Sequence, residues 1–272
     1  VNGFLHPTAS SLSEQELKKR LQHPDDERLF LLAEGFRRGM TIEELHDLTR
    51  IDSYFLAKIA GIVAMEQSLA SSKGWNREQL LTAKKMGFTD RTIADLVGEK
   101  EVTIRKERLK AGIFPVFKKV DTRVLNRNVE TPCFYSTYEG QGEQVLAREK
   151  PCVVVLGSGP IQIGQGVEFD YATVHAIKAI QEMGLEAVII NNNPETVSTD
   201  YQFSDRLYFE PLHIEDVLHI IERENPLGVI VQFGGQTSLN LARSLAEHGV
   251  TILGTSLEEI DRAENREKFE QL

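Results

Sequence analysis

Hydrophobic residues follow two different spacings along the chain, and the change of spacing divides it into two halves. Up to about residue 110, apolar residues recur every three or four positions, which is the spacing of one face of a helix. After residue 151, short β-branched runs alternate with helical segments, which is typical of a parallel sheet with crossover helices. The pattern predicts an all-helical domain followed by a three-layer, Rossmann-like α/β domain.

The first half is expected to be an array of helices. We predict helices over residues 13–21, 25–38, 41–48, 52–70, 76–86, 89–97 and 100–110. Ser13 with Glu16 fits a capping box at the start of one of them. Residues 113–138 contain prolines and aromatic residues without helical spacing, so an extended stretch is expected there. We therefore assign 1–138 to a helical domain, 139–150 to a polar linker, and 151–272 to the α/β domain.

A short internal repeat lies within the helical half. GMTIEELHDL at 39–48 matches GFTDRTIADL at 87–96. In each copy a glycine ends one helix, a threonine caps the next, and two apolar residues share its buried stripe. Duplication of a helical unit is the favoured interpretation. A chance match between two ordinary helix starts remains the alternative.

Residues 89–110, which begin within the second copy, also fit the pattern of a helix-turn-helix: a short helix, a turn at Gly98 and a basic second helix. Residues 76–119 contain eleven Lys or Arg against six Asp or Glu, so this stretch is locally basic. A nucleic-acid-binding module with an α/β sensor domain is therefore one functional hypothesis. The favoured interpretation is that Arg105, Lys106, Arg108 and Lys110 form the solvated face of an ordinary helix, because the whole chain carries a net charge of −10.

The second half predicts five parallel strands, at 153–155, 187–190, 207–209, 228–232 and 251–253. Helices are expected at 169–183 and 214–224, and a third begins at 234–237 and ends at Glu247. Three loops, 157–166, 191–200 and 234–237, would then meet at the carboxyl edge of the sheet, where ligands bind in open α/β folds. The alternative is that their glycines serve only tight turns and close packing.

Several kinds of site are disfavoured by the motifs. Gly157 and Gly159 begin a dinucleotide fingerprint, but the next glycine, Gly164, comes too late, and the second strand ends in Asn191 instead of an acid. There is no P-loop motif. The seven histidines and two cysteines have no metal-ligand spacing, and no nucleophile–base set can be assigned. We predict no metal site and no catalytic residue.

Composition narrows the setting. At 41% hydrophobic and 26% charged residues, the chain can bury a sizeable core. No membrane-spanning run or signal peptide is visible, so a cytoplasmic protein is expected. The chain starts at Val1 without a methionine and ends within a helix-competent run, from which we expect a piece of a longer polypeptide.

Four long motifs carry a family resemblance: LGSGPIQIGQGVEFDYATVHA, NNNPETVSTDYQFSDRLYFEP, GVIVQFGGQTSLNLA and GTSLEEIDRAENREKF. Together they resemble the large subunit of carbamoyl phosphate synthetase, at the start of its second, carbamoyl-phosphate-forming half. FPVFKKVDT and YSTYE are similar to the end of that subunit's helical oligomerisation domain. The resemblance covers essentially the whole chain and implies an oligomerisation domain followed by a pre-ATP-grasp domain.

The resemblance implies an ATP-dependent carbon–nitrogen ligase as the parent protein. That enzyme makes carbamoyl phosphate from bicarbonate, glutamine-derived ammonia and two MgATP (or Mn²⁺ in place of Mg²⁺), for pyrimidine and arginine biosynthesis. Its partners are a glutaminase small subunit and other large subunits, so a homo-oligomer is expected, without nucleic acid or membrane. The ATP-grasp domain would begin just after Phe269, so no cofactor is expected within this chain, and the fragment is expected to be inactive alone.

The resemblance also implies that the loops of the pre-ATP-grasp domain line the reaction chamber and the carbamate passage. The residues so implied are Gly157, Gly159, Gly164, Gln165, Gly166, Asn193, Glu195, Gly234, Gly235, Gln236 and Thr237. Glu195 and Asp200 are expected to position loops by accepting backbone N–H bonds. A small enzyme complete in itself, using the sheet edge for a nucleotide, is the third hypothesis, and the missing phosphate-binding motifs disfavour it.

Overall fold

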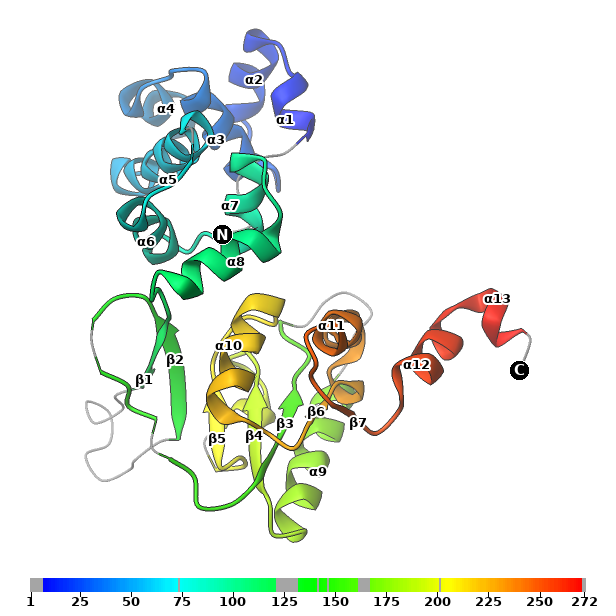
Figure 1. Cartoon of the computed structure of the whole chain (residues 1–272). Coiled ribbons are helices and arrows are strands. Elements are labelled where there is room, and N and C mark those ends of the chain that lie inside the picture. Colours follow the sequence, from blue (N-terminus) through cyan, green and yellow to red (C-terminus); the bar gives the residue numbers. More distant parts are fainter. Residues whose placement is uncertain are drawn as a thin grey trace. The chain divides into compact units, whose positions relative to one another are not determined.

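The protein consists of two compact units. The computed structural model describes residues 7–72, 74–120, 132–140, 142–145, 147–160, 167–200 and 202–270. The chain divides into a helical unit, Val1–Phe114, and an α/β unit, Pro115–Leu272 (Figure 1).

The helical unit has eight described helices, and the first five of them share one apolar core. They are α1 (Pro7–Ser11), α2 (Glu14–Leu21), α3 (Arg28–Arg37), α4 (Ile42–Thr49), α5 (Ser53–Ser71), α6 (Arg77–Lys85), α7 (Asp90–Val97) and α8 (Glu101–Lys110). The predicted capping box is confirmed at the start of α2, where Ser13 and Glu16 exchange side-chain and backbone bonds. No helix in the described ranges is long and apolar enough to cross a bilayer.

The two copies of the repeat have the same local structure. Gly39 and Gly87 both adopt a left-handed conformation, with φ of 87° and 84°. Thr41 caps α4 and Thr89 caps α7, each through its hydroxyl and the amide three residues later. The apolar residue four positions after each threonine is fully buried. The shared geometry confirms the local structure expected of each copy, and duplication of a helical unit stays a prediction.

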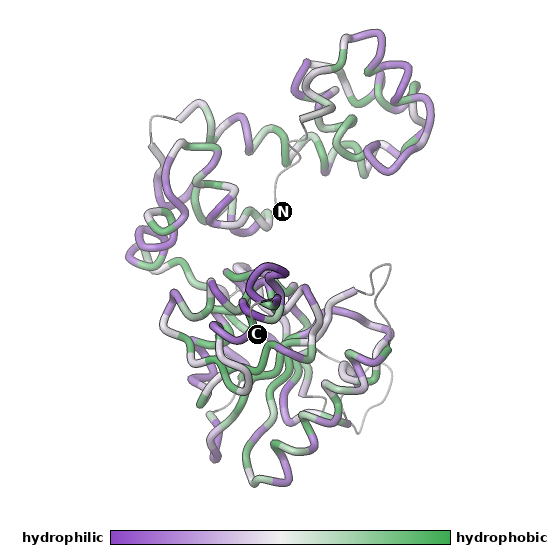
Figure 2. The backbone as a smooth tube through the Cα atoms, turned by 90° about the vertical axis from the view of Figure 1, so that its right-hand side faces the viewer, coloured by the Kyte–Doolittle hydropathy of each residue, from purple (hydrophilic) through white to green (hydrophobic). Residues whose placement is uncertain are grey.

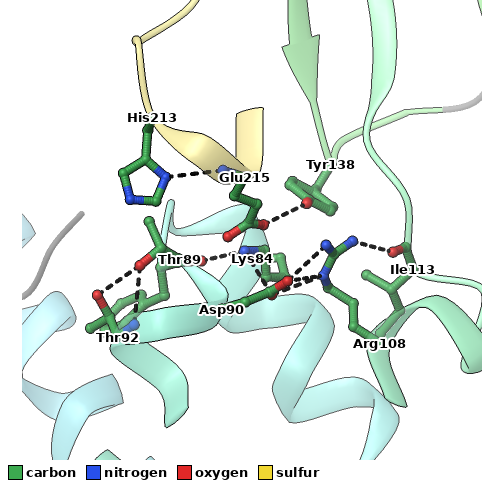
Figure 3. Close-up of polar contacts among 10 residues, drawn as sticks. Lys84, Thr89, Asp90, Thr92, Arg108, Ile113, Tyr138, His213 and Glu215 are labelled. Atoms are coloured by element: carbon green, nitrogen blue, oxygen red, sulfur yellow. Dashed lines mark hydrogen bonds and ion pairs between the residues drawn. The ribbon is translucent and has the colours of Figure 1, made fainter. Parts of the chain in front are cut away.

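A buried ionic cluster ties α6, α7 and α8 together (Figure 3). Arg108 is completely buried, and its Nε and Nη2 donate to the Asp90 carboxylate at 2.9 and 2.8 Å. Its Nη1 donates to the carbonyl of Ile113 at 2.9 Å, and Lys84 Nζ lies 3.2 Å from Asp90 Oδ1. The prediction that Arg108 lies on a solvated face is wrong, because Asp90 supplies a buried carboxylate that the charge pattern of α8 does not reveal. Because Arg108 is buried, its side chain cannot contact a nucleic-acid phosphate at the protein surface.

The α/β unit is built on one seven-stranded sheet with the order β1-β2-β5-β4-β3-β6-β7. Its strands are β1 (Val116–Lys119), β2 (Cys133–Thr137), β3 (Cys152–Leu156), β4 (Glu186–Ile190), β5 (Arg206–Tyr208), β6 (Val229–Ile230) and β7 (Ile252–Leu253). All neighbouring strands pair in parallel except β1, which is antiparallel to β2. The predicted Rossmann-like α/β fold is confirmed, with a mostly parallel sheet.

Helices cover both faces of this sheet. Its helical elements are α9 (Glu168–Glu182), η1 (Val197–Thr199), α10 (Ile214–Glu224), η2 (Gln232–Gly234), α11 (Gly235–Glu247), α12 (Leu257–Glu264) and α13 (Arg266–Phe269). Val153 and Val155 pack with α9 on one face, whereas Val154 and Leu156 pack with α10 and α11 on the other. In Figure 2 the hydrophobic segments gather inside the α/β unit, and most hydrophilic segments lie toward its outside. The sheet is therefore the middle of three layers.

The α/β unit starts earlier in the sequence than the predicted linker at 139–150. The extended stretch assigned to the helical domain supplies β1 and β2, which complete one edge of the sheet. Phe117 and Phe134 are buried against Tyr208, with ring centroids 5.2 and 5.6 Å away. Val145, within the predicted linker, is also buried in this core. The apolar side chains of the stretch find their partners in distant strands, which places the division near residue 115.

A second buried ionic cluster lies on this sheet, close to the amino end of β3. The Glu224 carboxylate lies 3.0 Å from Arg206 Nη1 and 2.8 Å from Arg148 Nη1, and it accepts a hydrogen bond from the Tyr208 hydroxyl. The side chain of Glu224 is fully buried. Burial also raises the pKa of the neighbouring Cys152 thiol to about 11, so this thiol stays protonated and unreactive at neutral pH.

Candidate functional site

The carboxyl ends of β3, β4 and β6 bring three loops to one edge of the sheet, as predicted. The described parts of these loops are residues 157–160, 191–200 and 231–235. Gly164, Gln165 and Gly166, implied for the passage, lie outside the described residues. The described part of the site consists of the remaining loop residues and the first turn of α9.

Asn191 joins the first two loops. It is fully buried, and its Oδ1 accepts bonds from the amides of Gly159 at 2.9 Å and Asn192 at 3.0 Å. Its Nδ2 donates to Ser198 Oγ at 3.2 Å. A Cβ atom at Gly157 would lie only 2.4 Å from Asn191 Cγ. Glycine at position 157 is therefore required by this close approach.

The third loop packs against the first. Ser238 on α11 donates its hydroxyl proton to the Gly157 carbonyl. A Cβ atom at Gly234 would lie 2.2 Å from that same carbonyl oxygen. Gly235 has a φ of 61°, a left-handed conformation that glycine adopts without strain. Packing and backbone geometry thus explain the glycines at 157, 234 and 235 without reference to a ligand.

The two polar residues predicted at the start of α11 have different surroundings. Gln236 Nε2 donates to Asn240 Oδ1 at 3.0 Å and to Glu264 Oε1 at 2.9 Å, which ties α11 to α12. Thr237 lies beside the first loop, where its Cγ2 would be 3.9 Å from a Cβ atom at Gly159. The described loops therefore gather Thr237 with Gly157 and Gly159, while Gln236 makes its contacts toward α12.

The second loop is shaped by side chains that accept backbone N–H bonds. Asn193 Oδ1 accepts from the amide of Glu195 at 3.0 Å, and Asp200 Oδ1 accepts from the amide of Gln202 at 3.1 Å. The prediction for Asp200 is confirmed. For Glu195 the observed bond differs from the predicted one, because its backbone amide donates to Asn193. The carboxylate that accepts backbone N–H bonds from this loop belongs to Asp170.

Asp170 was missed by the sequence reasoning. Its carboxylate accepts from the amides of Val197 at 2.8 Å and Ser198 at 3.1 Å. A signal was available, since Asp170 lies three and four positions before Thr173 and Val174 and therefore shares the buried stripe of α9. An acid on an apolar stripe indicates a buried partner.

A cavity of about 300 Å³ lies between the first turn of α9 and the second loop. Its lining includes Ser158, Val167, Asp170, Tyr171, Glu195 and Thr196. The described lining residues include two carboxylates and neither lysine nor arginine, so this part of the lining lacks the cations that usually bind a polyphosphate. Over the described ranges there is also no group of three or more His, Cys, Asp or Glu side chains placed to hold a metal ion.

Glu210 adds a buried carboxyl group near the end of β5. It accepts a hydrogen bond from the backbone N–H of Ser136 in β2. Burial raises the pKa of Glu210, and the bond from Ser136 partly opposes that change. The pKa of Glu210 is therefore higher in the folded protein than in the unfolded chain. As the pH rises through the folded-state pKa, deprotonation of Glu210 lowers the free energy of unfolding.

Two family models match the chain. The first is the oligomerisation domain of the carbamoyl-phosphate synthetase large chain, which matches residues 1–112. The second is the carbamoyl phosphate synthase preATP-grasp domain, which matches residues 149–262. The first match ends two residues before the helical unit does. The second covers the three loops, while β1 and β2 lie between the two matches.

Proposed function

The chain belongs to the carbamoyl phosphate synthetase large-chain family, with its oligomerisation domain at 1–112 and its preATP-grasp domain at 149–262, and from this premise we propose two non-catalytic roles. The helical unit mediates assembly. The loop edge of the α/β unit forms a wall of the reaction chamber and of the carbamate passage. The ATP, Mg²⁺ and catalytic groups belong to an adjoining ATP-grasp domain of the parent ligase.

The observation that supports the chamber role is that buried side chains join the three loops at the carboxyl edge of the sheet. Three loops from strands far apart in sequence are fastened together by fully buried Asn191, Ser198 and Ser238. Such a fixed surface, next to a cavity whose described charged lining residues are both carboxylates, suits guidance of an intermediate. The residues proposed for this wall are Gly157, Gly159, Gly164, Gln165, Gly166, Asn193, Glu195, Gly234, Gly235, Gln236 and Thr237.

The chamber role is tested by replacing Gly166 with phenylalanine in the complete synthetase. A bulky side chain in the proposed passage should obstruct the carbamate intermediate, which then decomposes after its ATP has been used. We expect more ATP hydrolysed per carbamoyl phosphate formed, measured by parallel assays of ADP and carbamoyl phosphate. An unchanged ratio would remove the passage from the proposal.

The assembly role rests on the match of the helical unit to an oligomerisation domain. Tyr54 and Phe55 at the start of α5 support it, since they are 62% and 60% exposed and contact each other edge to face. Exposed aromatic pairs of this kind are commonly covered in protein interfaces. We propose other large subunits as the partners of this unit, and a glutaminase small subunit as a further partner of the parent enzyme, in the cytoplasm.

Self-association is measured by size-exclusion chromatography with light scattering over a range of protein concentrations. We expect the chain to form a dimer or tetramer, and residues 115–272 alone to be monomeric. This truncation keeps β1 and β2, which a cut within 139–150 would remove from the sheet. A monomeric full chain at every concentration would mean that assembly needs surfaces elsewhere in the parent protein.

A further inference from the structure

We infer that Asp170 is a positioning residue that holds the wall segment 195–198 against the first turn of α9. The inference deepens the proposed chamber role and rests on it. The segment leads into η1, a short 3₁₀ helix whose first amides have no partner within the helix. The residue in the capping position, Thr196, makes no side-chain cap bond.

Asp170 provides the missing cap from another element. Its two oxygens receive the amides of Val197 and Ser198 at 2.8 and 3.1 Å, across 27 and 28 positions in sequence. The residue is only 9% exposed. A buried carboxylate that accepts two N–H bonds is a charge-assisted contact, stronger than one between neutral groups. The conformation of η1 therefore depends on α9.

The dependence reaches the cavity directly. Glu195 and Thr196 lie immediately before the capped amides, and both line the cavity together with Asp170. Ser198 is held from two sides, by Asp170 at its amide and by Asn191 at its hydroxyl. Without the Asp170 carboxylate, the segment loses these bonds to α9 and keeps the bond from Asn191 to Ser198 together with the bonds to Asn193 within its own loop. Glu195 and Thr196 would then lose their fixed place in the wall.

Asp205 provides a control. It lies at the amino end of β5, away from the loop edge at the carboxyl ends of the strands. Its Oδ2 accepts from the amide of Ala187 at 2.8 Å and from Gln181 Nε2 at 3.1 Å. Like Asp170, it joins a backbone amide to a distant segment. Unlike Asp170, it directly precedes β5 and is absent from the cavity lining. Asp205→Asn therefore removes a carboxylate–amide bond away from the wall, at an exposed position and with one backbone amide instead of two.

The local effect is measured by amide hydrogen exchange on the present chain. Asp170→Asn keeps the shape of the side chain but presents an N–H₂ group to one of the two amides. We expect exchange in residues 193–200 to accelerate at least tenfold, while residues 186–190 stay protected. Asp205→Asn should leave residues 193–200 unchanged. Unchanged exchange of 193–200 in Asp170→Asn would overturn the inference, and the protected strand distinguishes local release from global unfolding.

The functional effect is measured in the complete synthetase as ATP hydrolysed per carbamoyl phosphate formed. We expect Asp170→Asn to raise this ratio at least twofold and Asp205→Asn to leave it unchanged. Gly166→Phe serves as the reference. If Gly166→Phe raises the ratio and Asp170→Asn does not, the positioning role in the wall is overturned. If Gly166→Phe leaves the ratio unchanged, the proposed passage fails, while the exchange experiment still decides whether Asp170 holds the segment.

Discussion

Replacing Asp90 by alanine is expected to lower the free energy of unfolding of the helical unit by about 3–5 kcal/mol. Asp90 is 1% exposed and faces the cations of Arg108 and Lys84, which are also buried. Removal of the carboxylate leaves both positive charges in the interior without it. Folding still removes those two charges from water at a cost in free energy, and the attraction of the carboxylate no longer offsets that cost.

Trp75 makes this effect measurable in the intact chain. It is the one tryptophan of the sequence and directly precedes the capping residue of α6, so its fluorescence during urea unfolding reports on the helical unit. Asp95→Ala, an exposed position on the same helix, should change stability by less than about 0.5 kcal/mol. Adding Arg108→Met to Asp90→Ala should recover part of the loss, since one of the two buried positive charges is then removed as well. Equal stabilities of the Asp90 and Asp95 variants would contradict this account.

Replacing Glu224 by alanine is expected to destabilise the α/β unit by a similar amount, about 3–5 kcal/mol. The carboxylate joins Arg206 and Tyr208, the first and last residues of β5, to Arg148 just before β3. The side chains of the two arginines are only 12% and 14% exposed, so water cannot replace the lost carboxylate fully. The segment containing Arg148 would also lose its fastening to the sheet.

Hydrogen exchange of β4 measures this change, because its central amides exchange mainly through opening of the whole unit. A loss of about 3–5 kcal/mol corresponds to roughly a hundred- to several-thousand-fold faster exchange. Glu182→Ala, an exposed acid on α9, is the control and should leave exchange nearly unchanged. Protection of residues 186–190 that survives in Glu224→Ala would show that the cluster contributes little.

The helices were predictable because their signals are local. Thr41, Thr89 and Ser13 act as caps within three residues of their own position. The predicted helix 214–224 coincides with α10, which begins after His213 and ends at left-handed Asn225. Boundaries set by a few adjacent residues can be read from a single sequence.

The contacts that the sequence did not reveal are long-range. β1 and β2 contain residues typical of strands, but their place depends on β5, and nothing nearby in the sequence specifies that pairing. Asp170 and Asp90 are likewise ordinary acids near helix starts until a distant segment supplies the partner. The loops of the candidate site were located by the strand order, whereas the side chains that join them were not.

The pairing of β2 with β5 has a consequence for synthesis on the ribosome. Phe134 leaves the ribosome well before Tyr208, its partner in the sheet. At about 5–20 residues per second, several seconds separate the two. The β1–β2 hairpin is marginal by itself during this interval, whereas the helices that precede it can already pack. We therefore expect the nascent chain to carry a folded helical unit with an exposed aromatic segment behind it, which is the stage at which a chaperone would bind.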